Sequence, residues 1–187
     1  MQRRPVRFTP LAIAHVAAVV AALSATACAD EPESAWVSSV VDGDTIRVDL
    51  RGRTITVRLI GVDTPEVADR NDPAAPPQPF ACEAAAYTRR TLTGKAVRLE
   101  YEPEERLDRY GRSLAYVFLD DGTFFNRELI RGGYARAYTR FRLRYRKQFR
   151  ADESAARRDH RGLWAPGAAP RDLHERVDTG RKKCTGF

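Results

Sequence analysis

Three short segments of this 187-residue chain carry the acids and arginines whose types and spacing could do chemistry. They read Asp-Gly-Asp-Thr at 42–45, Arg-Leu-Ile-Gly-Val-Asp-Thr-Pro-Glu at 58–66 and Asp-Arg-Tyr-Gly-Arg at 108–112. Carboxylates and backbone carbonyls are the ligands that a hard cation such as Ca²⁺ takes, and the planar guanidinium of arginine binds a phosphate through paired hydrogen bonds. Because a carboxylate near an ion-bound water can act as its base, the segments predict a site for one divalent cation and one phosphodiester.

Taken together and in this order, the three segments resemble the motifs of the thermonuclease family, the staphylococcal-nuclease-like phosphodiesterases. Asp-Gly-Asp alone occurs in many turns, whereas the ordered set of acids and arginines is specific. The resemblance runs from about residue 35 to about residue 164. It implies an α+β fold, an OB-fold five-stranded Greek-key β-barrel with about three packed α-helices. It also implies a calcium-dependent nuclease that hydrolyses DNA and RNA and leaves 3′-phosphate products.

The resemblance assigns the metal ligands residue by residue. Asp44 and Asp63 match ligand positions of the family, and the backbone carbonyl of Thr64 matches a third ligand, for one Ca²⁺ per chain. Asp42 matches a nearby acid that tunes the site rather than binding the ion. Without the family, a glycine-flanked aspartate is most often a turn former, so the convergence of these acids is an expectation about the fold.

The same resemblance assigns the catalytic groups. Glu66 matches the glutamate that orients or deprotonates the attacking water. Arg58 and Arg112 match the two arginines that neutralise the phosphorane as negative charge builds. From the residues alone, Glu66 could instead cap a turn or helix after Pro65, and Arg58 could be an exposed strand arginine.

Substrate contacts are expected from basic and aromatic residues. Arg109 and Tyr110 match positions that contact a terminal phosphate in the family. Tyr138 and Phe141 lie where the family places tyrosines, and each is either a base-stacking residue or part of the core. The expected partners are DNA and RNA, favoured when single-stranded or denatured, and we expect a monomer with no obligate protein partner.

A dense basic run lies near the end of the domain. Its members are Arg136, Arg140, Arg142, Arg144, Arg146, Lys147 and Arg150. Our first interpretation is the solvated face of the last helix, and the alternative is a surface that binds a nucleic-acid backbone in a salt-dependent way.

The N-terminus predicts export. Residues 1–27 combine a basic start with an apolar run over 11–23 and small residues after it, which is the pattern of a signal peptide. The run is short for a membrane span, and an uncleaved anchor is the alternative. Removing these residues takes away three arginines and no acids, so the formal net charge falls from +7 to +4. A mildly basic chain suits a polyanionic substrate, as it suits any basic surface protein.

The three cysteines bear on export as well. Cys28 follows the small residues and is a candidate for lipidation, so a free secreted or periplasmic protein and a membrane-anchored lipoprotein are the two alternatives. Cys82 and Cys184 could form a disulfide in an oxidising compartment or stay as two thiols. The absence of Cys-x-x-Cys argues against a cysteine metal site.

Hydrophobic periodicity predicts the elements that must position these residues. A linker over 28–34 precedes one domain over 35–165, and a tail over 166–187 follows it. Alternation predicts a hairpin of strands over 45–50 and 54–60, with Arg58 on its polar side. The remaining expected elements are a proline-rich loop over 67–79, helices over 80–93, 126–131 and 142–160, and strands over 95–101, 113–119 and 134–138.

Two other functions fit parts of the pattern. A catalytically inactive OB-fold module would bind single-stranded nucleic acid without cutting it, and inactive relatives typically lack one or more of the acids or arginines. A lipid-anchored envelope protein would use its carboxylates only to bind Ca²⁺. Asp44, Asp63, Glu66, Arg58 and Arg112 are all present, which favours the enzyme over both alternatives.

Overall fold

The described part of the chain contains the whole predicted domain except for a short stretch of its proline-rich loop. The computed structural model describes residues 32–68, 74–168 and 184. The predicted signal peptide, Cys28 and nearly all of the predicted tail lie outside the described residues. Among the residues that are described, no helix has the length and apolar character needed to cross a membrane.

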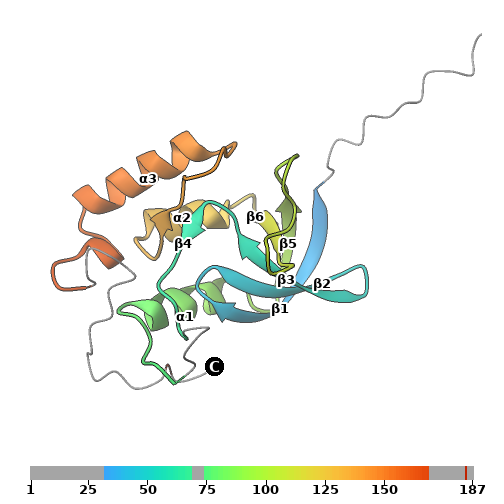
Figure 1. Cartoon of the computed structure of the whole chain (residues 1–187), viewed down its shortest axis with the longest axis horizontal. Helices are drawn as coiled ribbons and strands as arrows, with labels where there is room; N and C mark the ends of the chain where they lie inside the picture. The colour runs from blue at the N-terminus through green and yellow to red at the C-terminus, as the bar shows by residue number, and fades with distance from the viewer. Residues whose placement is uncertain (1–31, 69–73, 169–183, 185–187) are drawn as a thin grey trace, which may run out of the picture.

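Five strands close into a barrel (Figure 1). They are β1 (Glu33–Asp42), β2 (Thr45–Leu50), β3 (Arg53–Leu59), β5 (Ala96–Glu100) and β6 (Ser113–Leu119). Their order around the barrel is β1-β2-β3-β6-β5, and β5 pairs back onto β1. The β3–β6 pairing is parallel and the other pairings are antiparallel. The predicted α+β fold, an OB-fold five-stranded Greek-key barrel, is confirmed.

Three helices and a small second sheet pack around the barrel. α1 (Ala81–Leu92) packs against β1, α2 (Phe125–Arg131) packs on β6, and α3 (Arg146–Arg158) packs on α2. The short strands β4 (Val62–Asp63) and β7 (Arg136–Ala137) pair antiparallel, and a 3-10 turn follows at Gly162–Trp164. This second ladder sets Asp63 beside the segment of chain that leads into α3.

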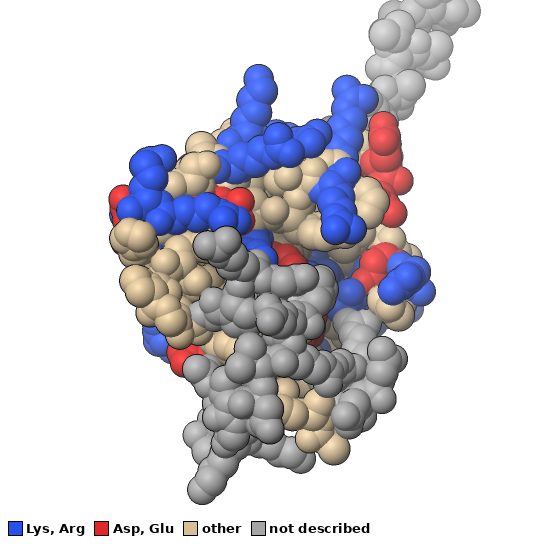
Figure 2. All heavy atoms as spheres, turned by 60° about the vertical axis from the view of Figure 1, so that its left-hand side comes forward, with Lys and Arg blue, Asp and Glu red and all other residues tan. Residues whose placement is uncertain are grey.

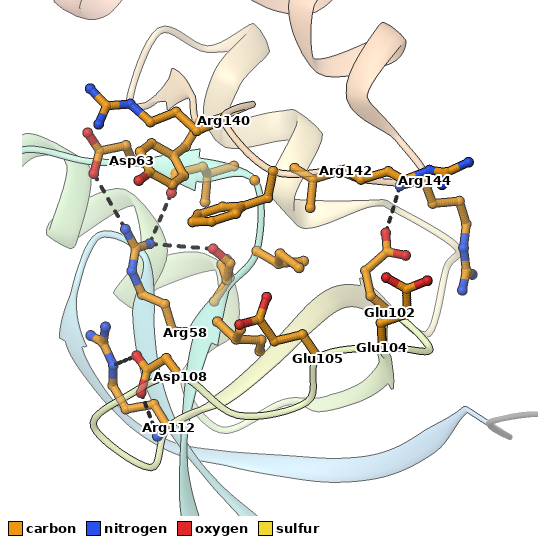
Figure 3. Close-up of a pocket in the computed structure, with 18 of the residues that line it drawn as sticks. Arg58, Asp63, Glu102, Glu104, Glu105, Asp108, Arg112, Arg140, Arg142 and Arg144 are labelled. Carbon is orange, nitrogen blue, oxygen red and sulfur yellow. Dashed lines mark hydrogen bonds and ion pairs between the residues drawn. The ribbon is translucent and has the colours of Figure 1, made fainter.

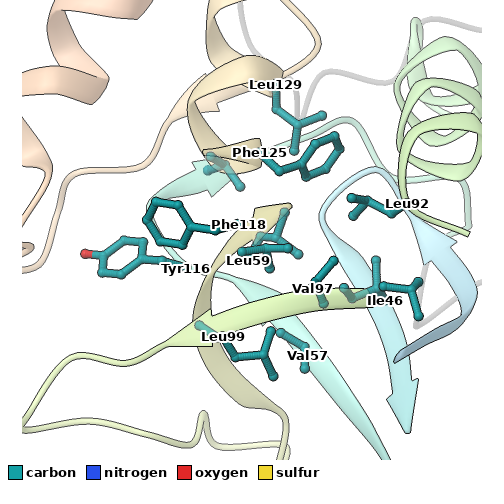
Figure 4. Close-up of a cluster of buried hydrophobic side chains, with 14 of the residues drawn as sticks. Ile46, Val57, Leu59, Leu92, Val97, Leu99, Tyr116, Phe118, Phe125 and Leu129 are labelled. Atoms are coloured by element: carbon teal, nitrogen blue, oxygen red, sulfur yellow. The ribbon is translucent and has the colours of Figure 1, made fainter. Parts of the chain in front are cut away.

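The hydrophobic core fills the barrel and extends beneath α1 and α2 (Figure 4). Ile46, Val48 and Val57 are buried on β2 and β3, as the alternation in the sequence predicts. In β6 the consecutive residues 115–118 are all buried, because this strand is covered on both faces. The polar side chains that β2 and β3 carry, Arg58 among them, are therefore attached to a closely packed barrel.

β1 is a strand that the sequence analysis does not predict. It begins at Glu33, inside the expected linker over 28–34. Its pairing with β2 shifts register between Val37 and Ser39 and again just before Asp42. Such irregularities interrupt the alternation of apolar and polar residues, which is the signal that marks a strand in a sequence.

The last helix is shorter than predicted. α3 begins at Arg146 instead of residue 142. Just before it, the backbone N–H of Arg144 donates to Glu102 Oε1 at 2.6 Å, and these preceding residues are held as irregular chain. The strand expected over 134–138 is likewise reduced to the two residues of β7.

A disulfide joins Cys82 to Cys184, which are 102 residues apart in the sequence. Of the two alternatives for these cysteines, the structure therefore has the bridge. It ties the first turn of α1 to the C-terminal end of the chain. A cross-link over so long a loop stabilises the fold mainly by restricting the unfolded chain.

Gly61 links β3 to β4 and thereby helps to place Asp63. Its φ is +78°, and a Cβ at this position would lie 2.2 Å from Cε2 of Phe149 in α3. We expect Gly61→Ala to lower the free energy of unfolding by roughly 2–5 kcal/mol, because left-handed strain and overpacking add together. Denaturant-induced unfolding measures this loss.

Gly52→Ala is the matched control. Gly52 has a similar φ of +77°, but nothing lies within 4 Å of its Cβ position. This variant therefore carries the backbone strain alone, with an expected loss of about 1–2 kcal/mol. Equal losses in the two variants would contradict the close packing of Gly61 against α3.

Candidate active site

The turn between β1 and β2 carries Asp44 into the interior, where it is only 1% exposed. Its Oδ2 accepts the backbone N–H of Thr64 at 2.9 Å, and its Oδ1 accepts the Thr45 hydroxyl at 3.2 Å. Gly43 in the same turn has no room for a side chain, since a Cβ would lie 2.8 Å from Thr64 Oγ1. The turn and the chain after β4 are therefore locked together.

Arg58 joins the buried Asp44 to Asp63 in one cluster of charged side chains, of which Figure 3 labels Arg58 and Asp63. It projects from β3, and only 16% of its side chain is exposed. Its Nη1 pairs with Asp44 Oδ2 at 2.5 Å and its Nη2 with Asp63 Oδ1 at 3.4 Å. Burial alone would lower the pKa of Arg58, but the surrounding carboxylates outweigh burial and raise this pKa above its ordinary value. The alternative of an exposed strand arginine is wrong.

Two further acids add negative charge to the cluster. Asp42 is buried, and its Oδ1 accepts the backbone N–H of Asp44 at 3.1 Å. Burial raises the pKa of Asp42 well above its ordinary range, and the charges of Asp44 and Glu66 raise it further, while Arg58 lowers it. The negative charges of Asp42, Asp44 and Glu66 therefore repel one another within this cluster.

Glu66 is positioned through its backbone. Its N–H donates to Gln78 Oε1 at 2.8 Å, and the N–H of Gln78 donates to the Glu66 carbonyl at 3.0 Å. These two bonds tie the ends of the proline-rich loop together beside the acidic cluster. Gln78 is thus a positioning residue that the sequence analysis missed, and nothing in the composition of the loop marks it.

The donor set suits a hard divalent cation. Asp44 and Asp63 could supply carboxylate oxygens and Thr64 a backbone carbonyl to such an ion. Burial is the main cause that raises the pKa of Asp42, and the charges of Asp44 and Glu66 add to it; a cation would relieve this repulsion. Within the described residues, no three His, Cys, Asp or Glu side chains surround one common metal position. Arg58 contacts both Asp44 and Asp63, so a cation held by these acids would share them with the guanidinium.

A pocket of about 980 Å³ opens beside the cluster (Figure 3). The loop that precedes β6 and the segment that precedes α3 form much of its lining. The predicted site residues that line it are Arg58, Asp63, Arg109, Tyr110, Arg112 and Tyr138. Those outside its lining are Asp44, Thr64 and Glu66. The pocket therefore brings both predicted catalytic arginines to one space, while Asp63 is the one predicted acid among the described residues that lines it.

Arg112 is held by Asp108, four residues earlier. Asp108 Oδ1 accepts the backbone N–H groups of Tyr110 and Arg112, and its Oδ2 accepts Nε of Arg112 at 2.6 Å. Burial would raise the pKa of Asp108, but these hydrogen bonds lower it, so the carboxylate stays ionised. Among the described residues, the terminal Nη atoms of Arg112 have no hydrogen-bond partner and are available to a phosphate. The sequence analysis missed this role of Asp108, although an Asp before a Gly turn is a typical signal for it.

Exposed aromatic side chains line the same pocket. Tyr110 and Phe141 are 55% and 58% exposed, and the Phe141 ring centre lies 5.9 Å from that of Tyr138. The backbone N–H of Tyr138 donates to the Gly61 carbonyl at 2.9 Å, which places Tyr138 next to β4. Arg109 Nη2 donates to the Tyr110 hydroxyl at 2.5 Å. The core alternative is therefore wrong for Phe141.

The fold and the pocket together define a class of protein. An OB-fold barrel carries a buried arginine–carboxylate cluster, and the pocket beside it offers guanidinium groups and aromatic faces. In general, guanidinium groups pair with phosphates and aromatic faces stack on flat rings.

The chain belongs to the staphylococcal nuclease homologue family, whose model matches residues 56–166. It is similar to the thermonuclease of Staphylococcus hyicus, 42% identical over 130 residues that cover 69% of this chain and 74% of that protein. It is 50% identical over 105 residues to the thermonuclease of Staphylococcus intermedius, covering 56% of this chain and 60% of that protein. It is also 35% identical over 127 residues to endonuclease YncB of Bacillus subtilis, covering 67% and 58%. The family resemblance drawn from the motifs is confirmed.

Asp42→Asn should stabilise the folded protein at neutral pH in a chelating buffer. Because the pKa of Asp42 is higher in the folded than in the unfolded chain, its ionisation reduces stability as pH rises from the unfolded pKa through the folded one. The amide removes the charge and still offers an oxygen to the N–H of Asp44. Denaturant unfolding across this pH range should show an advantage of the variant that grows with pH and is absent in acid.

Asp120→Asn is the control for this experiment, because Asp120 is an exposed aspartate outside the cluster. It should show no comparable advantage at neutral pH. An Asp42→Asn protein that is less stable than the wild type under the same conditions would show that the charge of Asp42 is compensated in the fold.

Proposed function

We propose that this chain is a nuclease, a calcium-dependent phosphodiesterase that hydrolyses DNA and RNA and prefers single-stranded or denatured strands. The observation that carries the proposal is the pair Arg58 and Arg112, which line one pocket while each is anchored by carboxylates. A binding surface alone would not require arginines fixed in this way next to a cluster of acids. The names of the thermonuclease and endonuclease relatives support the same reaction class.

In the proposed reaction, the phosphate of the substrate binds between the two arginines. Glu66 takes a proton from the attacking water, an O–P bond forms, and the P–O5′ bond breaks in line. Arg58 and Arg112 offset the negative charge that builds on the phosphoryl oxygens as phosphorus becomes five-coordinate. The leaving O5′ takes up a proton, assisted by Arg112, and a 3′-phosphate remains on the other product.

The proposed metal ligands are Asp44, Asp63 and the carbonyl of Thr64, for one Ca²⁺. When bound, the ion would polarise a phosphoryl oxygen and lower the pKa of its bound water. Arg109 and Tyr110 are the proposed contacts for a terminal phosphate, and Tyr138 is a proposed stacking surface for a base.

We also propose that the chain is exported after removal of residues 1–27. The disulfide between Cys82 and Cys184 supports an oxidising compartment, because such bridges are rare in proteins that stay in the cytosol. Cys28 would then be the first residue, either free or lipidated.

Glu66→Gln should reduce cleavage of heat-denatured DNA by at least ~100-fold in the presence of Ca²⁺, because the amide cannot take the proton of the water. The measurement compares Ca²⁺, Mg²⁺ and a chelator. Glu83→Gln is the matched control, since Glu83 is an exposed glutamate on α1 away from the pocket. It should cleave at the wild-type rate.

Cleavage that needs no divalent cation would refute the calcium dependence. Retention of DNA without cleavage by the wild-type chain under every metal condition would instead identify an inactive binding module. Equal rates for wild type and Glu66→Gln would remove Glu66 from the reaction.

Export can be measured by the mass of the mature protein recovered from cells that express the full sequence. Cleavage before Cys28 should remove 27 residues. If the mature protein is recovered from the membrane fraction and its first residue carries additional mass, the lipoprotein alternative is supported. A full-length chain that stays in the cytosol would overturn the proposal of export.

A further inference from the structure

The walls of the pocket carry opposite charges (Figure 3). The first part of the loop between β5 and β6 contributes Glu102, Glu104 and Glu105 to the lining, which we call the acidic wall, and Arg109 and Arg112 follow in the same loop nearer β6. The segment that leads to α3 contributes Arg140 and Arg142, which we call the basic wall. A polyanion that enters the pocket is therefore repelled by the three glutamates and attracted by the basic wall, Arg109 and Arg112.

Arg144 connects the segment that leads to α3 with the end of β5 and the first residues of the loop after it. Its backbone N–H donates to Glu102 Oε1 at 2.6 Å, its Nη1 pairs with Glu100 Oε2 at 3.3 Å, and its Nη2 donates to the Tyr101 carbonyl at 3.0 Å. The buried hydroxyl of Tyr116 also donates to Glu102. These bonds fix the segment in front of α3, so its remaining arginines occupy a defined position beside the pocket.

Further cations continue the basic wall beyond the pocket. Residues 136–151 contain seven Lys or Arg and no Asp or Glu. Arg142, Arg146 and Lys147 are exposed, and in the part of the chain that the structure describes none of the three pairs with an acid. Figure 2 shows Lys and Arg side chains gathered along the top of the molecule, at the height where α3 lies in Figure 1.

Helix stability does not explain these cations. The first turn of α3 contains no acid, and its N-cap residue Tyr145 makes no side-chain capping bond. The N-terminal end of a helix carries a partial positive charge, so Arg146 and Lys147 stand where cations are unfavourable. A bound anion would offset this repulsion.

We propose that Arg142, Arg146 and Lys147 form a basic ridge that binds phosphates of the same single strand whose scissile phosphate lies at Arg58 and Arg112. The inference rests on the proposed nuclease function and adds a direction to it, because the strand extends from the pocket toward α3 and away from the acidic wall. Arg142 belongs both to the ridge and to the pocket lining, and this continuity favours a nucleic-acid strand over a membrane surface as the ligand.

The test uses the full chain and oligonucleotides that contain one ordinary phosphodiester, extended on either side by linkages that resist hydrolysis. The extensions are charged phosphorothioates or uncharged methylphosphonates of increasing length. We expect kcat/KM to rise with a charged extension on one side only, and not with an uncharged one. Arg146→Gln/Lys147→Gln should lose this gain, and its salt slope for binding should be smaller by roughly 1.4, about 0.7 for each lost phosphate contact.

Arg53→Gln/Lys95→Gln is the matched control, since it makes the same charge change at exposed positions on the barrel, outside the pocket lining. It should keep the gain from charged extensions. Unfolding midpoints of both double variants establish that they are folded. A second measurement, the binding of an all-phosphorothioate strand in chelator, does not depend on catalysis.

The outcomes separate the ridge from the nuclease activity. Cleavage of the shortest substrate without any gain from charged extensions would overturn the ridge and leave the nuclease proposal standing. If the protein cleaves no substrate but strand binding weakens in the ridge variant, the nuclease proposal is overturned and the ridge stands. Unchanged strand binding in that variant, together with lost binding to phosphatidylglycerol vesicles, would overturn the ridge as a strand site and assign it to a membrane.

Discussion

The site depends on the compensation of buried carboxylates by Arg58. A carboxylate as enclosed as Asp44 loses nearly all its contact with water, which is unfavourable by several kcal/mol unless partners replace the water. Arg58, the N–H of Thr64 and the hydroxyl of Thr45 are those partners. They come from the start of β2, from β3 and from the chain after β4, so the same contacts hold one end of the barrel together. The chemistry and the fold therefore share one set of interactions.

The two arginines of the pocket are held by different means. Arg58 is buried and fixed by acids that are distant in the sequence, whereas Arg112 is held within its own loop by Asp108. The buried side chain of Arg58 cannot move without disturbing the barrel. The five-residue turn that holds Arg112 can change its conformation with few other changes in the structure. The pocket thus combines one rigid guanidinium with one whose terminal nitrogens make no hydrogen bond to another described residue, while its Cζ lies 5.5 Å from the centre of the Tyr110 ring.

Patterns within short stretches of the sequence predicted the strands whose side chains alternate regularly or are buried throughout. Alternation placed the β2–β3 hairpin and hence Arg58, and an apolar run identified β6 as a doubly covered strand. β1 was missed because its irregular pairing breaks the alternation, and the start of α3 was misplaced because Glu102 holds the backbone before it. The order of the motifs identified the family. The hydrogen bond from Glu66 to Gln78 and the pocket itself could not be predicted, because they form only when segments distant in the sequence meet.

The net charge of this protein is a poor guide to how it meets a polyanion. Some of its acids are buried, and the exposed charges are distributed unevenly around the pocket. The acids Asp42 and Asp44 are buried around the turn between β1 and β2, and Asp44 pairs with Arg58, which lines the pocket. At the surface, Glu102, Glu104 and Glu105 line one part of the pocket, and Arg140 and Arg142 line another. This distribution suits the proposed nuclease, since acids spread over the whole lining would repel a phosphate. Arg58 belongs both to the lining and to the acidic cluster, so it connects the proposed phosphate position with the proposed metal ligands Asp44 and Asp63.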